Sequence, residues 1–117
     1  MKKAVSDLSN MELDYLVAKI DDILYMRDTE GRVLEIDKDK RVYAVTADSR
    51  MYAYKPTTQW RQGGPLIDKY RISVQRTGSE WTADIDREIT AVGATPLVAA
   101  MRALVTQKRG SMVEVDE

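Results

Sequence analysis

Two amphipathic segments, one near each end of the chain, limit the possible folds more than any other feature of the sequence. The first covers about residues 9–26 and begins with Ser9 and Glu12, which have the S-x-x-E spacing of a helix capping box. The second covers about residues 95–109 and begins with Thr95-Pro96, because threonine caps free amides and proline at the first helical position loses no hydrogen bond. Apolar residues recur every three or four positions in both, so each helix is predicted to place one apolar stripe against a core. The predicted stripes contain Leu13, Leu16, Val17, Ile20 and Leu24 in the first helix, and Leu97, Val98, Ala100, Met101, Leu104 and Val105 in the second.

Short β-prone runs occupy most of the sequence between these helices. Turn residues separate the runs, so we predict two hairpins and two additional short strands. In chain order the candidate strands are Val33–Ile36, Val42–Thr46, Arg50–Tyr54, Tyr70–Arg76, Glu80–Ile85 and Met112–Val115. Trp81 is predicted to face inward, together with Ala83 and Ile85 at period two. The sequence therefore predicts an α+β fold, with a small, mostly antiparallel sheet of two hairpins packed with two main helices, in one domain over residues 1–117.

Composition narrows the possible functions. Hydrophobic residues make up 44% and charged residues 32% of the chain, which is typical of a globular protein. The 18 Lys and Arg residues oppose 19 Asp and Glu residues, so the formal charge of −1 gives no long-range attraction for nucleic acid. Cysteine and histidine are both absent, which removes cysteine nucleophiles, histidine acid–base catalysis and almost all zinc sites. We therefore predict a protein that is not an enzyme and that has no metal and no cofactor.

The expected location follows from the apolar pattern. The first ten residues lack a sustained apolar signal region, and no apolar run approaches the ~20 residues that span a bilayer. We expect a cytoplasmic protein with no membrane partner.

Tyr54–Pro65, with the sequence YKPTTQWRQGGP, is predicted to form a binding loop. Gly63-Gly64 permits a turn that aims backbone amides into a concavity, and Trp60 offers a flat face for stacking. The alternative is a simple Gly-Gly-Pro turn beside a core tryptophan. The polar density around Trp60 favours binding of a nucleotide-like ligand. With two residues of the second helix, the predicted ligand-binding set is Tyr54, Thr57, Thr58, Trp60, Gln62, Gly63, Gly64, Thr95 and Arg102.

The start of the second helix supplies those two residues. Free amides after Thr95 and the positive end of the helix dipole suit a phosphate. Arg102 lies seven residues later, so it shares the helix face of Thr95. The alternative for Arg102 is a solvated side chain or one that bridges to Asp84 or Asp86.

Several of these motifs occur together in a known family. The chain combines LDYLVAK (13–19), YKPTTQWRQGGPLI (54–67), Trp81 and TPLVAAMR (95–102). In order and spacing these elements resemble the NinX-like family of phage proteins, over nearly the whole chain. The family is one of small proteins of unknown function, so the resemblance implies expression inside an infected bacterium rather than a particular reaction.

Three functions of different classes stay open. The favoured one is a non-catalytic binding protein that sequesters a small nucleotide-derived immune signal, of the cyclic nucleotide or ADP-ribose type, by analogy with counter-defence proteins. The second is an interaction module that binds and inhibits a host protein, with Trp60 and Tyr54 as interface anchors. The third is an accessory protein of phage DNA replication or recombination, which the near-neutral charge disfavours. A modest core also favours a homo-oligomer.

Overall fold

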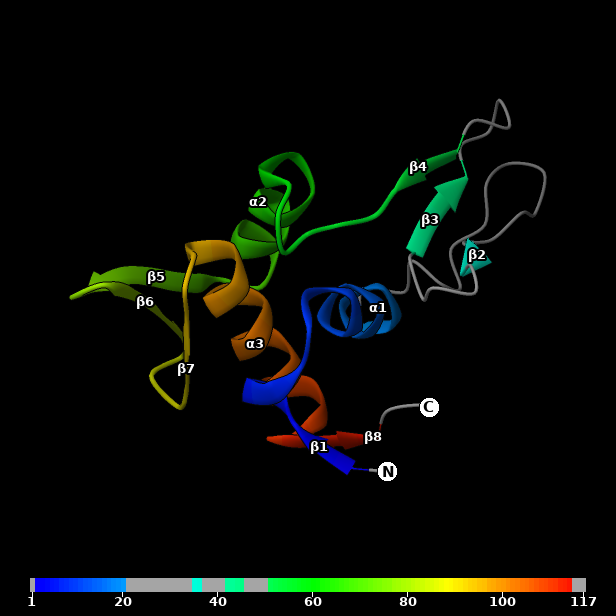
Figure 1. Cartoon of the computed structure of the whole chain (residues 1–117). Helices are drawn as coiled ribbons and strands as arrows, with labels where there is room; N and C mark the ends of the chain where they lie inside the picture. The colour runs from blue at the N-terminus through cyan, green and yellow to red at the C-terminus, as the bar shows by residue number, and fades with distance from the viewer. Residues whose placement is uncertain (1, 21–34, 37–41, 46–50, 115–117) are drawn as a thin grey trace.

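The fold is known from a computed structural model, which describes residues 2–20, 35–36, 42–45 and 51–114 (Figure 1). The helices are the 3₁₀ helix η1 (Val5–Asp7) and the α-helices α1 (Asn10–Ile20), α2 (Trp60–Lys69) and α3 (Pro96–Arg109). The strands are β1 (Lys2–Ala4), β2 (Glu35–Ile36), β3 (Val42–Val45), β4 (Met51–Ala53), β5 (Ile72–Thr77), β6 (Glu80–Ile85), β7 (Ile89–Gly93) and β8 (Met112–Glu114).

The described strands form three separate antiparallel sheets. Their orders are β1-β8, β2-β3-β4 and β5-β6-β7. The predicted α+β class and both predicted hairpins are confirmed, but the hairpins lie in different sheets rather than in one. Residues 21–26 of the predicted first helix, and residues 33–34, 46, 50 and 115 of the predicted strands, lie outside the described residues.

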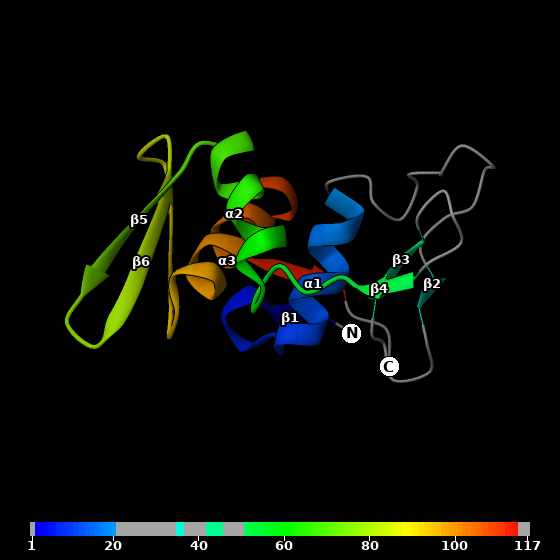
Figure 2. The ribbon, with the colours of Figure 1, turned by 90° about the horizontal axis from the view of Figure 1, so that it is seen from above.

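Helix α3 is the centre of the fold. It packs against β5, β6 and β7 on one side and against α1, α2 and η1 on the others (Figures 1 and 2). A helix covered on several sides must be apolar around most of its circumference. The predicted stripe is buried accordingly, and it is widened by Ala99 and Ala103, which are also fully buried. Each large apolar side chain buried here contributes about 1.5–3 kcal/mol relative to an exposed one.

The ends of α3 match the sequence prediction. Thr95 Oγ1 accepts the backbone N–H of Val98 at 3.2 Å, which is the predicted N-cap. The backbone N–H of Gly110 donates to the Thr106 carbonyl at 2.9 Å, and its φ of 85° is a conformation that glycine adopts without strain.

The capping box at the start of α1 is also confirmed. The Glu12 amide donates to Ser9 Oγ at 3.2 Å, and the Ser9 amide donates to Glu12 Oε1 at 2.9 Å. Lys3 Nζ, on β1, lies 3.0 Å from the same carboxylate oxygen. Burial alone raises the pKa of Glu12, but the bonds from Ser9 and Lys3 outweigh it and hold that pKa below its usual value. The carboxylate therefore joins β1 to the start of α1.

The predicted loop Tyr54–Pro65 is wrong in its second half. Residues from Trp60 onward form α2, so Gly63-Gly64 and Pro65 lie inside a helix rather than in a turn. Two glycines and a proline are poor helix formers, which is why the sequence indicates a turn. Packing decides otherwise, because a Cβ at Gly63 would overlap the Pro56 carbonyl oxygen and come within 2.6 Å of Leu97 Cδ2. Only glycine lets α2 lie this close to α3.

Strand β7 was not predicted from the sequence. The turn that leads into it places Asp86 and Arg87 at φ values of 55° and 62°, without any glycine in the turn. Left-handed conformations of this kind usually carry a glycine or asparagine signal, and the segment has neither. Strand β1 was also missed, although its partner β8 agrees with the predicted strand at Met112–Val115.

A buried carboxyl group attaches the segment before α2 to α1. Asp14 is 5% exposed, and its Oδ1 accepts the backbone N–H of Thr57 at 3.0 Å. Burial raises the pKa of Asp14 to about 6, while the Thr57 amide and the charge of Lys55 act in the opposite direction. The Thr57 hydroxyl also faces this carboxyl, but its oxygen makes no hydrogen bond of normal geometry to the described residues.

The two adjacent glycines of α2 provide a matched test of this packing. Gly63→Ala is expected to lower the unfolding free energy by about 1–3 kcal/mol, because the new methyl group has no space. Gly64→Ala is expected to be neutral or to raise it by up to ~1 kcal/mol, since its Cβ would approach only Trp60 Cε3, at 3.8 Å. Urea unfolding of both variants measures the difference, and equal effects would contradict the packing role of Gly63.

Asp14 predicts an unusual pH dependence of stability. Its pKa is higher in the folded state than the ordinary 3.8, so the folded protein holds the proton more tightly than the unfolded chain. The unfolding free energy is therefore expected to fall by roughly 3 kcal/mol at most as the pH rises from 3.8 to about 6, and to receive no further contribution from Asp14 above that.

Two substitutions at this position separate charge from hydrogen bonding. Asp14→Asn keeps an oxygen acceptor for the Thr57 amide, so it should remove this pH dependence and match or exceed the wild type in stability at pH 7. Asp14→Ala should be less stable than Asp14→Asn at every pH, because the buried amide loses its acceptor. Asp68→Asn, at an exposed carboxyl group, controls for the change in net charge. Retention of the wild-type pH slope in Asp14→Asn would refute the assignment.

Candidate functional site

The structure does not bring the predicted ligand-binding residues together into one site. Tyr54 is 5% exposed and Thr57 is 1% exposed, so both side chains belong to the core, and the Thr57 amide is held by Asp14. Neither side chain is open to a ligand from solvent in this arrangement.

Other predicted residues surround the start of α2. The Lys55 carbonyl accepts the amides of Thr58 at 3.1 Å and Gln59 at 2.8 Å, which makes a tight turn before the helix. Gln62 Oε1 accepts the Lys55 amide and holds this turn from inside α2. Among the polar side chains around Trp60, that of Gln62 therefore bonds to the backbone of its own segment.

Trp60 itself lies at the surface. Its side chain is 57% exposed on the first turn of α2, and Gly64 lies one turn further along the same face. The exposed indole is suited to contact with another molecule. It does not border the groove in which Arg102 lies.

The amino-terminal end of α3 is closely packed. Thr95 already accepts the Val98 amide, and the Thr95 carbonyl accepts the Ala99 amide at 3.0 Å. Gly93 presses on this turn, since a Cβ there would lie 2.6 Å from the Ala99 nitrogen. Thr95 and Arg102 share a helix, but Thr95 does not line the groove beside Arg102.

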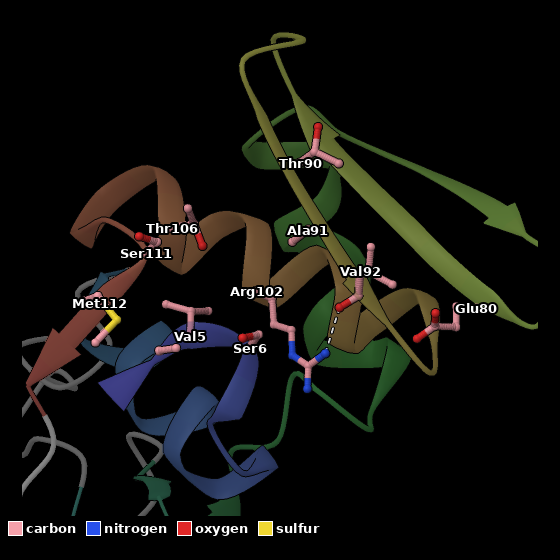
Figure 3. A pocket seen from close by; sticks show the side chains of 11 residues that line it. Val5, Ser6, Glu80, Thr90, Ala91, Val92, Arg102, Thr106, Ser111 and Met112 are labelled. Carbon is pink, nitrogen blue, oxygen red and sulfur yellow. Dashed lines mark hydrogen bonds between the residues drawn. The ribbon is translucent and has the colours of Figure 1, made fainter. Parts of the chain in front are cut away.

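A groove of about 550 Å³ lies beside Arg102 (Figure 3). Its walls come from β1 and η1, from the start of β6, from β7, from the middle and second half of α3, and from the start of β8. This volume is within the range of small-molecule sites. We name it the Arg102 groove, and its lining residues are Ala4, Val5, Ser6, Glu80, Thr90, Ala91, Val92, Arg102, Thr106, Ser111 and Met112.

The Arg102 guanidinium group is only partly satisfied. Nη1 donates to the Val92 carbonyl oxygen at 2.7 Å, which fixes the side chain across the gap between α3 and β7 (Figure 3). Nε is buried and has no hydrogen-bond partner among the described residues. An unpaired buried donor costs about 1–3 kcal/mol, so an acceptor at this position would stabilise the protein.

The rest of the lining is neutral or acidic. Arg102 and Glu80 are the only charged residues among those that line the groove. Hydroxyl groups come from Ser6, Thr90, Thr106 and Ser111, and Val5, Ala91 and Met112 supply apolar surface. This mixture can hold a small ligand with one anionic group.

The sequence singled out Arg102, and the structure places this residue in a groove that the sequence did not predict. The hydroxyl groups of Ser6 and Ser111 come from opposite ends of the chain and meet because β1 pairs with β8. Three residue pairs that join segments more than a hundred residues apart leave no local sequence pattern that would predict the pairing. Asp14 was missed as well, because it lies beside the apolar stripe of α1 and resembles a solvated residue in sequence.

The parts of the chain that the structure describes contain neither a metal-binding cluster nor a membrane-spanning helix. No three acidic residues gather into a metal-binding group there. None of the described helices has both the length and the apolar character that a membrane crossing requires.

Comparison with known proteins gives a family. No curated protein matches the sequence. The family model described as bacteriophage P22 NinX matches residues 4–108. This range contains every described element from η1 to β7 and all of α3 but its last residue, while β8 and most of β1 lie outside it. The chain therefore belongs to the bacteriophage P22 NinX family.

Proposed function

We propose that this protein is a non-catalytic binding protein that acts in the cytoplasm of an infected bacterium. Its ligand is a small nucleotide-derived signal of the host immune response, of the cyclic nucleotide or ADP-ribose type, held in the Arg102 groove. Sequestering such a molecule would make the protein a counter-defence factor. The observation that carries the proposal is the buried, unpaired Nε of Arg102 beside a groove of about 550 Å³.

Arg102 also has a purely structural use, which is to cover the edge of the sheet. Strand β7 lies at the edge of the described sheet β5-β6-β7, and edge strands are commonly protected by charged side chains. The bond from Nη1 to the Val92 carbonyl fits that use. It does not account for Nε, because a guanidinium group that only covered the edge would lose nothing by leaving Nε in water. The buried Nε favours a ligand.

The non-catalytic part of the proposal rests on the chemistry of the lining. Phosphoryl or glycosidic cleavage needs a positioned base, a metal or a pair of carboxylates. Glu80 is the single carboxylate of the Arg102 groove, and the chain has no histidine or cysteine. Binding without turnover is what these groups support.

The proposal is tested by calorimetry with the full chain against cyclic nucleotides, ADP-ribose derivatives and ordinary mononucleotides. We expect at least one nucleotide to bind and to be recovered intact after the protein is denatured. Arg102→Gln should weaken that binding about ten- to hundredfold, since it removes a charged hydrogen bond. Arg109→Gln, at an exposed arginine on the same helix, is the control. Absence of binding to every compound would refute the proposal.

A second candidate function is supported by the exposure of Trp60. A tryptophan that is 57% exposed at the start of α2, next to the exposed Arg61, has the character of an interface anchor. The partner would be a host protein, and this function is independent of the Arg102 groove.

The Trp60 surface is tested by capture of partners from phage-infected cells. Trp60→Ala should lose a host protein that the wild type retains, while nucleotide binding stays unchanged because Trp60 does not line the groove. Met11→Ala removes a comparably exposed apolar side chain, at 46% exposure, and should retain the partner. Equal capture by Trp60→Ala and the wild type would eliminate this function. The expected homo-oligomer stays a prediction, which analytical ultracentrifugation can measure.

A further inference from the structure

We infer that the Arg102 groove selects a singly charged phosphodiester, of the cyclic mononucleotide class, over phosphomonoesters and pyrophosphates. The inference rests on the proposed function and specifies its ligand. It follows from the charges around the groove, from the orientation of α3 and from the free edge of the guanidinium group.

The charges of the lining balance one negative charge at most. Arg102 is the single cation among the residues that line the groove, and Glu80 is an anion. A phosphomonoester carries about −1.5 to −2 at neutral pH, and a pyrophosphate also carries more than one charge. The surplus charge would lie in a partly enclosed site without a counterion, which disfavours binding.

The direction of α3 adds to this preference. The helix lines the groove through Arg102 and Thr106, in its middle and second half, and the groove continues to Ser111 beyond its end. The carboxyl end of a helix carries partial negative charge. The positive end, at Thr95, does not line the groove, so the helix dipole cannot offset a second negative charge of the ligand.

Two nitrogens of the Arg102 guanidinium group donate to none of the described residues. Because Nη1 is committed to the Val92 carbonyl, the remaining fork consists of Nε and Nη2. A fork of this kind binds two oxygens of one acid group in a bidentate manner. A phosphodiester has two terminal oxygens and one charge, so it would satisfy Nε and neutralise the guanidinium group at once.

Other parts of a cyclic mononucleotide also find partners in the groove. Figure 3 shows Thr106 and Ser111 on the β8 side of Arg102, and Glu80 beyond Val92 on the other side. Hydroxyl groups suit the ribose oxygens, and the apolar surface of Val5 and Ala91 suits a base.

The test compares matched nucleotides by calorimetry with the full chain at pH 7.5. The 3′,5′-cyclic monophosphates of all four common bases are compared with the corresponding 5′-monophosphates, with ADP-ribose and with cyclic dinucleotides. We expect one cyclic monophosphate to bind at least about tenfold more tightly than its 5′-monophosphate. Glu80→Gln should narrow that ratio, because it removes the anion that opposes the second charge.

The pH supplies an internal control, since the second pKa of a phosphomonoester is about 6. Binding of the 5′-monophosphate should tighten as the pH falls from 7.5 to 5.5, while binding of the cyclic compound, measured in parallel, should change little. Glu80 is the titratable carboxyl of the lining, so the Glu80→Gln variant repeats the series without it.

The possible results distinguish a failure of the charge selection from a failure of the proposed function. Tighter binding of a 5′-monophosphate, ADP-ribose or a cyclic dinucleotide would overturn the charge selection and leave the proposed function standing. Absence of binding to all of these compounds would remove both. A preference for the cyclic monophosphate that Arg102→Gln does not reduce would also overturn the inference.

Discussion

The packing of α3 on several sides is the constraint on which the other elements depend. The sheet β5-β6-β7, helices α1 and α2, and η1 all bury their apolar surface against this helix, so none has a separate core. Close approach is required at two points, Gly63 in α2 and Gly93 at the end of β7, where a Cβ would meet α3. The lack of a side chain at these two glycines thus sets how closely α2 and β7 approach α3.

The sequence predicted those features whose cause is local. Ser9 and Glu12 bond to each other across three residues, and Thr95 bonds to Val98, so both helix starts could be identified from spacing alone. The apolar period of α3 likewise indicated its buried face. Helix α2 could not be predicted in this way, because its glycines and proline favour a turn locally and only contact with Pro56 and Leu97 explains them.

The candidate site shows the same division. Helical periodicity placed Arg102 away from the core line, but it gave no information about β1, β7 and β8, which meet around it. The polar residues near Trp60 suggested a ligand from composition, whereas the structure uses the Gln62 side chain to hold the turn before α2 and the backbone amide of Thr57 to bind Asp14. Polar density in a sequence does not distinguish groups that bind a ligand from groups that bind their own backbone.

The pairing of β1 with β8 has a consequence for synthesis of the chain. One wall of the Arg102 groove contains Ala4 and Met112, which are partners in this two-stranded sheet. The ribosome makes β8 more than a hundred residues after β1, so the groove cannot be complete until β8 has been made. Any molecule that enters the groove would then meet all of its walls only after β8 has been made.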